Sequence, residues 1–180
     1  VIVSPLAEPA AEAARVRDWL AARGVVADTA APGEEGSLGQ INYRILWPTR
    51  IIRNEGSDPN NASIAVVFTV GGVRILLPGD LETASQEALI SGSGPIGADV
   101  VKIPHHGSAN QSPRLISWSG ARLAIVSAGL HYMYGHPAQQ TLSAWQRAGA
   151  AVARTDQDGD VAIARNADAD VVLVPRKQQQ

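Results

Sequence analysis

Arg74-Ile-Leu-Leu-Pro-Gly-Asp80 is the stretch from which the fold is inferred, because an apolar strand ends there in Pro-Gly and a carboxylate follows at once. Asp99-Val-Val-Lys-Ile-Pro-His105-His106-Gly-Ser108 repeats this pattern with two imidazoles at the strand end. Sheets of α/β proteins bind their ligands at the carboxyl ends of the strands. The two stretches therefore predict an α/β sheet with a polar site along one edge.

Apolar periodicity predicts further strands and helices on both sides of these stretches. The predicted strands cover residues 1–4, 25–29, 41–47, 63–70, 73–77, 99–103, 122–127, 151–154, 160–164 and 171–174. The predicted helices cover residues 10–23, 81–90, 112–118 and 138–148, and polar loops are expected at 31–39 and 48–60. Helices alternate with short apolar strands, which is typical of the α/β class. We expect one domain over residues 1–175 and a frayed tail over residues 176–180.

The composition excludes several classes of protein. The chain has 180 residues, of which 45% are hydrophobic and 18% charged, so it can bury a core and is not disordered. A net charge of −2 does not favour a non-specific nucleic-acid binder, so contact with a polyanion would need a local patch or a bound metal. The absence of cysteine excludes disulfides and thiolate metal sites. Arg74 and Gly71-Gly72 interrupt the apolar window 62–79, which favours a hairpin over a membrane span.

Asp80 is the first candidate for a functional residue. Aspartate is a hard oxygen donor that can bridge two divalent cations. The structural alternative is that Asp80 caps the helix predicted to begin near Leu81, as aspartate often does. The two interpretations do not exclude each other.

The pair His105-His106 is the second candidate. Neutral imidazole is the commonest metal ligand, and neighbouring side chains of an extended chain point in opposite directions. One histidine should therefore face a metal, with His106 favoured, while the other supports the ligand or donates a proton. Gly107 would let the backbone pass close to a substrate, and Ser108 could donate to a phosphate oxygen. The alternative is a pair of histidines hydrogen-bonded to the backbone of a loop.

His136 is the third candidate, because it follows another apolar strand and precedes Pro137 at the start of a predicted helix. In that place it could act as a general acid or contact a phosphate, and the structural alternative is a helix cap. Three strand ends that carry Asp, His-His and His can converge in space. Together they therefore indicate a functional site more strongly than each does alone. His131 is predicted to lie on the surface. The segment 156–160 lacks the spacing and the glutamate of a calcium loop, and it is predicted to be an Asp-Gly hairpin turn.

Five motifs in a fixed order resemble a known family. They are Asn60-Asn-Ala-Ser63, Leu76-Leu-Pro-Gly-Asp80, Lys102-Ile-Pro-His-His-Gly-Ser108, Tyr134-Gly-His-Pro137 and Arg154-Thr-Asp-Gln-Asp-Gly159. The series resembles the C-terminal metallo-β-lactamase-like domain of the bacterial DNA-internalisation competence protein, the ComEC family, over nearly the whole chain. The resemblance implies a four-layer αββα sandwich with a metal site at one edge.

The resemblance also implies a function. The family's domain belongs to a polytopic membrane protein that passes single-stranded DNA into the cell. The resemblance implies that the domain is a metal-dependent nuclease that acts on the strand that is not taken up. The implied partners are single-stranded or double-stranded DNA and a membrane channel in a separate part of the protein. The implied cofactors are divalent ions, zinc or manganese, with no small organic cofactor. The implied location is the outer face of the bacterial membrane.

The resemblance assigns roles to residues by their position in the motifs. Asp80 resembles a ligand that bridges two metals, and His106 or His105 resembles a ligand of the second metal. His136 resembles an active-site residue, so that His105 or His136 would protonate the leaving oxygen. Asn60 stands where related hydrolases carry a further ligand histidine. The residues expected to contact substrate are Ser108, Gly107 and Asn60.

One motif of the superfamily, His-x-His-x-Asp-His, is not found, because no histidine precedes His105. About three protein ligands usually hold a catalytic metal, so the chain alone is expected to bind metal weakly and to be nearly inactive. Either the domain begins upstream of Val1 or the chain is a degenerate homologue. Residues 1–3 have the pattern of the end of a buried strand, which favours the first explanation. An exposed strand edge or core face is then expected near the N-terminus.

Two further functions are compatible with the sequence. The first is a non-catalytic module that assembles or gates a DNA channel, and the missing ligands favour it. The second is a hydrolase of a small phosphodiester. Metal stoichiometry separates the nuclease from the module, and a small chromogenic diester separates the nuclease from the small-substrate hydrolase.

Overall fold

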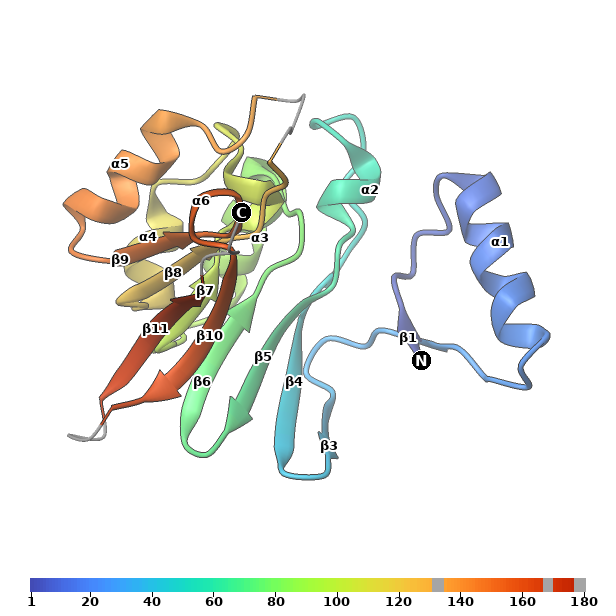
Figure 1. Ribbon diagram of the computed structural model, residues 1–180. Coiled ribbons are helices and arrows are strands. Elements are labelled where there is room, and N and C mark those ends of the chain that lie inside the picture. The colour runs from blue at the N-terminus through green and yellow to red at the C-terminus, as the bar shows by residue number, and fades with distance from the viewer. Residues whose placement is uncertain (131–134, 167–169, 177–180) are drawn as a thin grey trace.

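The computed structural model describes residues 1–130, 135–166 and 170–176, and its centre is one large mixed sheet (Figure 1). Within the described residues this sheet has seven strands in the order β3-β4-β5-β6-β7-β8-β9. They are β3 (Glu35–Leu38), β4 (Ile41–Trp47), β5 (Ala65–Val70), β6 (Val73–Leu77), β7 (Val100–Lys102), β8 (Leu123–Val126) and β9 (Ala151–Arg154). The predicted α/β class is confirmed.

Strand direction divides the sheet into two halves. Strands β3 to β6 form an antiparallel meander, whereas β6, β7, β8 and β9 are parallel neighbours. The carboxyl ends of four successive strands therefore lie along one edge of the sheet, which is where the sequence places Asp80, His105-His106 and His136.

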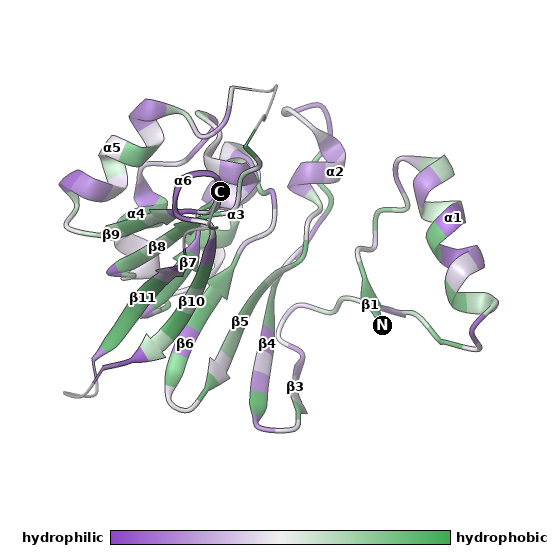
Figure 2. Ribbon diagram, viewed as in Figure 1, coloured by the Kyte–Doolittle hydropathy of each residue, from purple (hydrophilic) through white to green (hydrophobic). Residues whose placement is uncertain are grey.

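One face of the sheet is packed against helices. Val67, Leu76, Val101 and Ala124 are cross-strand partners in one row, and all four are buried. Their contacts include Leu89, Leu115, Trp118, Leu142 and Trp145 in a single apolar cluster. Those side chains come from α3 (Thr83–Gly92), α4 (Arg114–Ser119) and α5 (Gln139–Arg147). Figure 2 shows the apolar colouring of the central strands of the sheet and the alternation of apolar and polar residues along β4.

The opposite face is covered less completely. The hairpin of β10 (Asp160–Arg165) and β11 (Val171–Arg176) forms a separate antiparallel sheet, which lies beside β6 in Figure 1. A hydrogen bond of 3.2 Å from Arg165 Nη2 to the carbonyl oxygen of Gly71 ties this hairpin to the β5–β6 turn. Arg176, the last residue of β11, pairs with Asp160, the first residue of β10. Residues 177–180 of the predicted tail lie outside the described residues.

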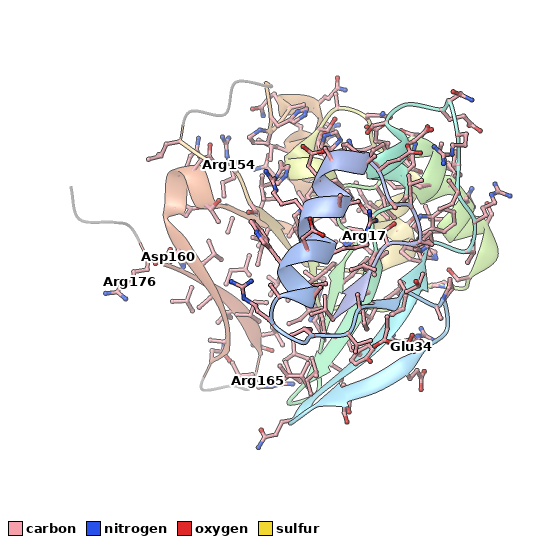
Figure 3. The ribbon with its side chains drawn as sticks, turned by 90° about the vertical axis from the view of Figure 1, so that its right-hand side faces the viewer. Arg17, Glu34, Arg154, Asp160, Arg165 and Arg176 are labelled. Carbon is pink, nitrogen blue, oxygen red and sulfur yellow. The ribbon has the colours of Figure 1, made fainter. Side chains whose placement is uncertain are left out.

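The N-terminal segment stands apart from this core. It consists of α1 (Ala10–Ala21) and a parallel pair of short strands, β1 (Ile2–Val3) and β2 (Asp28–Thr29). No residue of α1 is buried, and Trp19 and Val26 are 58% and 74% exposed. Figure 3 shows α1, with Arg17, in front of the strands. The expected exposed apolar surface near the N-terminus is present.

Three local predictions were wrong. Strand β3 lies in the predicted loop 31–39, because pairing with β4 stabilises a stretch whose Gly, Ser and Glu have low strand propensity. Helix α2 (Asp58–Asn61) lies in the predicted loop 48–60, where Ser57 caps it by accepting from the Asn60 N–H. The predicted hairpin turn at 156–160 is instead the one-turn helix α6 (Thr155–Asp158), because β9 and β10 belong to different sheets.

None of the helices in the described part of the chain is both long and apolar enough to cross a membrane.

Candidate functional site

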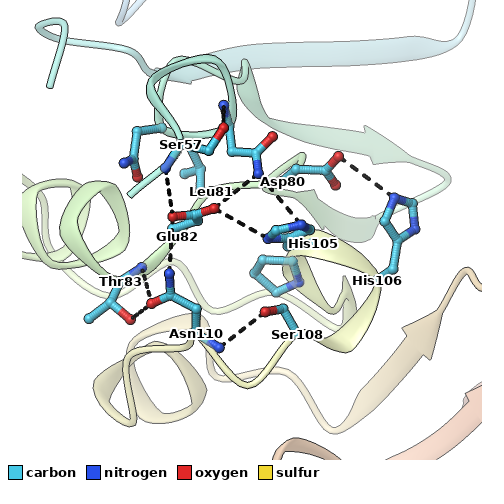
Figure 4. A network of polar contacts seen from close by, with 12 residues as sticks. Ser57, Asp80, Leu81, Glu82, Thr83, His105, His106, Ser108 and Asn110 are labelled. Atoms are coloured by element: carbon cyan, nitrogen blue, oxygen red, sulfur yellow. Dashed lines mark hydrogen bonds and ion pairs between the residues drawn. The ribbon is translucent and has the colours of Figure 1, made fainter. Parts of the chain in front are cut away.

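The segments that follow β6, β7 and β8, together with α2, bring the predicted site residues together at the carboxyl edge of the parallel strands. Asp80 Oδ2 lies 3.6 Å from His106 Nε2, and Asn60 Nδ2 lies 3.5 Å from His105 Nε2 (Figure 4). The ring centres of His105 and His136 are 5.1 Å apart. Five residues that are up to 76 positions apart in the chain, from Asn60 to His136, thus form one cluster.

Asp80 does not cap the following helix. Helix α3 begins at Thr83, its N-cap residue is Glu82, and no side chain caps it. The structural alternative for Asp80 is therefore wrong, because two further residues separate it from the first turn. Its Oδ1 instead accepts a hydrogen bond of 3.2 Å from Lys102 Nζ, which also donates to the Gly79 carbonyl.

The histidine pair lies on a left-handed turn. His105 has φ 46° and His106 has φ 53°, and Gly107 follows with φ 80°. The prediction of an extended backbone here was wrong, because a short 3₁₀ turn starts at Pro104, two residues after the end of β7. A non-glycine residue in this region costs about 1–3 kcal/mol, and such strain is typical of functional sites.

The hydrogen bonds of His106 orient it toward Asp80. Its Nδ1 lies 2.7 Å from the Ser127 carbonyl oxygen, which can only accept, so Nδ1 carries the proton. The histidine is thus bonded to the backbone, as the structural alternative expected, but its Nε2 faces the Asp80 carboxylate. An imidazole nitrogen and a carboxylate oxygen thus face each other there, and both are atom types that bind divalent metal ions.

The donor types fit zinc or manganese, which accept imidazole nitrogen and carboxylate oxygen. The number of donors is smaller than a full shell: no group of three or more His, Asp or Glu residues suited to hold an ion occurs in the described part of the chain. Asp80 and His106 therefore fit as two ligands of a metal shell rather than as a complete site.

A buried carboxylate, Glu82, lies beside His105 (Figure 4). Its side chain is only 7% exposed, and it accepts hydrogen bonds from the Ser57 N–H, Asn60 Nδ2 and Asn110 Nδ2 at 3.0–3.1 Å. His105 Nδ1, a buried nitrogen without a hydrogen-bond partner among the described residues, lies 3.7 Å from Glu82 Oε1. Glu82 thereby joins α2, the start of α3, the histidine turn and the loop before α4.

Gly107 and Ser108 are turned toward the protein interior. Ser108 is buried, and its Oγ accepts from the Asn110 N–H at 3.1 Å. A Cβ at Gly107 would lie 2.7 Å from Pro137 Cβ. The glycine therefore permits close packing against the segment that carries His136, and contact of either residue with substrate stays a prediction.

Replacing Gly107 by alanine is expected to cost about 1–3 kcal/mol of stability, because it combines a left-handed backbone with overlap on Pro137. Urea unfolding with unchanged m-value measures the loss. Gly149→Ala is the control, because Gly149 also has a positive φ, 88°, but nothing lies within 4 Å of its Cβ position. Equal costs for the two variants would show that the contact with Pro137 is not tight.

His136 lies in surroundings that disfavour its charge. Burial, followed by the nearby His105 and His106, lowers the pKa of His136 below its ordinary value, and Asp80 raises it only in part. The unfolded chain therefore binds this proton at a higher pH than the folded chain. Stability is fully present above the ordinary value of about 6.5 and declines as pH falls toward the folded pKa.

We expect the urea midpoint to be lower at pH 5 than at pH 7.5. The decrease should be smaller in His136→Gln, because glutamine does not take up a proton in this pH range. Parallel pH profiles for the two proteins would contradict the depressed pKa of His136.

Three residues that contact the cluster or its supporting carboxylate, Lys102, Glu82 and Asn110, were not singled out from the sequence. Lys102 and Glu82 stood within quoted motifs or next to them, but periodicity gives no sign that their side chains turn toward the site. Asn110 lies in a polar loop, where an asparagine is common. Glu82 could have been recognised only as an acidic residue just before the first turn of α3, and that required knowing that α3 begins at Thr83.

Comparisons with known proteins agree with the motifs. The chain is 32% identical over 142 residues to ComE operon protein 3 of Bacillus subtilis, a match that covers 77% of this chain and 18% of that protein. It is 26% identical over 121 residues to competence protein ComA of Neisseria gonorrhoeae, covering 66% of this chain and 17% of that protein. The chain is ComEC-like: it resembles one segment of these competence proteins.

This ComEC-like domain spans less than a fifth of the length of the curated relatives it matches. A comparison with protein-family models finds no match. Among solved structures, the chain resembles a protein from Thermotoga maritima described as belonging to the metallo-β-lactamase superfamily, with 16% identity and a TM-score of 0.33 over 56% of this chain and 49% of that one.

Proposed function

We propose that this ComEC-like domain is a metal-dependent phosphodiesterase that acts on DNA during uptake, as part of a longer protein with a membrane channel and with this domain on the outer face. The observation that carries the proposal is the approach of Asp80 Oδ2 and His106 Nε2 to 3.6 Å, with the His106 tautomer set by Ser127. The competence proteins among its relatives support DNA as the substrate.

Each residue of the cluster has a part in this proposal. Asp80 and His106 would hold a divalent ion, zinc or manganese, and such an ion supplies Lewis-acid polarisation of a phosphodiester and activation of water. His105 or His136, whose rings are 5.1 Å apart, would face the leaving oxygen and give it a proton. Lys102 holds the Asp80 carboxylate in place from its other oxygen.

A second candidate is a non-catalytic module that helps to assemble or gate the DNA channel. It is favoured by the supply of only two metal ligands from the described residues, where a catalytic ion usually has about three.

The test is metal binding and DNA cleavage by the same chain. Binding of Zn²⁺ and Mn²⁺ is measured by calorimetry, and cleavage of labelled single-stranded DNA, double-stranded DNA and a small chromogenic diester is followed in millimolar metal. We expect weak metal binding and slow cleavage of DNA that stops with a chelator and with Asp80→Asn. Asp18→Asn is the control, because Asp18 lies on the exposed helix α1.

The outcomes separate the candidates. If the chain binds metal but cleaves no substrate at any metal concentration, the result favours the non-catalytic module. Faster cleavage of the small diester than of DNA would identify a small-substrate hydrolase. A chain that neither binds metal nor cleaves contradicts the phosphodiesterase.

A further inference from the structure

Thr155, the first residue after β9, holds the chain beyond the end of β8. The last pair of the parallel ladder is Val126 with Arg154. Beyond that pair the ladder ends, yet the Thr155 hydroxyl lies 2.8 Å from both the N–H and the carbonyl oxygen of Ala128. The hydroxyl accepts from the first and donates to the second. One side chain thus replaces the backbone contacts that the strands no longer make.

The contact fixes the residue next to Ala128, which is Ser127. The Ser127 carbonyl is the acceptor for His106 Nδ1 at 2.7 Å. A carbonyl in this place selects the imidazole tautomer that carries its proton on Nδ1, and so leaves Nε2 toward Asp80. The position of Ser127 therefore decides which nitrogen of His106 is presented to the site.

The segment that carries Thr155 is itself anchored. Asp158 Oδ2 accepts from the Arg154 N–H at 2.8 Å. The guanidinium of Arg154 pairs with Asp156 through two hydrogen bonds, at 2.6 and 3.1 Å. The motif Arg154–Gly159, which contributes no candidate ligand, is thus an internally bonded turn that presents one hydroxyl to the end of β8.

We propose that Thr155 is a positioning residue for His106, which acts from β9 through Ala128 and Ser127 to set the His106 tautomer and direct Nε2 toward the metal position. The inference rests on the proposed function for its metal but not for the tautomer. Loss of a group that orients a ligand histidine typically lowers metal affinity 10–100-fold.

The experiment compares wild type, Thr155→Val and Thr155→Ser. Valine keeps the shape and removes the hydroxyl, whereas serine keeps the hydroxyl. The tautomer of His106 is read in the metal-free chain at pH 8 from nitrogen–proton correlations of the ring, assigned with His106→Gln. Zn²⁺ affinity is measured by calorimetry. We expect Nδ1–H to dominate in wild type and Thr155→Ser, and Thr155→Val to shift the ring toward Nε2–H and lose about tenfold in Zn²⁺ affinity.

A Thr155→Val ring that keeps the wild-type tautomer overturns the proposal, and so does a Thr155→Ser ring that loses it. Thr155→Ala serves as a second variant if valine prevents folding, and it is read by the same ring signals. If wild type binds no Zn²⁺, the proposed function fails, but the tautomer comparison still decides the role of Thr155. If wild type binds Zn²⁺ and the tautomer does not change in the variant, only the role of Thr155 fails.

Discussion

Replacing Glu82 by alanine is expected to lower the free energy of unfolding by about 3 kcal/mol, because removal of this buried carboxylate takes the acceptor from three donors at once. The Ser57 N–H, Asn60 Nδ2 and Asn110 Nδ2 all point at this carboxylate. Each unsatisfied buried donor costs about 1–3 kcal/mol, offset in part by release of the desolvated charge. For a chain of this length the melting temperature should drop by roughly 6–12 °C.

Two variants show whether the hydrogen bonds are responsible. Glu82→Gln keeps the shape but replaces one acceptor oxygen with a donor that faces other donors, so it should also destabilise the fold. Glu12→Ala removes an exposed carboxylate on α1 and should change the melting temperature little. A tolerated Glu82→Gln would mean that the volume of the side chain matters and its charge does not.

Replacing Asp80 by alanine should weaken binding of a divalent ion at least about 100-fold, more than the loss of an orienting group alone. The change removes one of two neighbouring donors and leaves Lys102 and His106 facing each other without a carboxylate. The measurement is Zn²⁺ calorimetry on folded protein, with the fold checked by circular dichroism.

Lys102→Met gives the opposite expectation. The ammonium lies 3.2 Å from Asp80 Oδ1 and competes with a metal for that carboxylate, so its removal should raise metal affinity several-fold. Opposite signs for the two variants indicate a cation site at Asp80. A parallel loss in both would mean that the Asp80–Lys102 pair is mainly structural.

The edge at which the site forms could be predicted from the sequence, because parallel strands end on the same side. The apolar runs before Asp80 and His105 form the neighbouring parallel strands β6 and β7. Parallel pairing alone therefore brings the residues after them to the same edge. The helix after Asp80 was misplaced by two residues, since an aspartate after a glycine is also a good cap signal. Because of this error Glu82 was not identified as the N-cap residue of α3, where its side chain is buried.

The histidine turn could not be predicted for a different reason. Alternation of side chains holds only while the backbone stays extended, and β7 ends at Lys102, with a turn starting at Pro104. Consecutive left-handed histidines are rare, and they are stabilised here by contacts from other loops, such as the Ser127 carbonyl and the Ala138 N–H bonded to the Gly107 carbonyl. Interactions between distant segments leave no local pattern in a sequence. The prediction that His131 lies on the surface falls outside the described residues.

The division of the sheet into an antiparallel meander and a parallel half has a consequence for synthesis on the ribosome. Hairpin strands β3 to β6 pair with neighbours in sequence and can form as soon as they emerge, whereas β7, β8 and β9 each need a crossover before they pair. Strand β9, which directly precedes Thr155, is the last strand of this sheet to be made. A nascent chain therefore carries Asp80, His105 and His106 before the last strand of the sheet has been made, so we expect the site to take its final form only when that strand pairs.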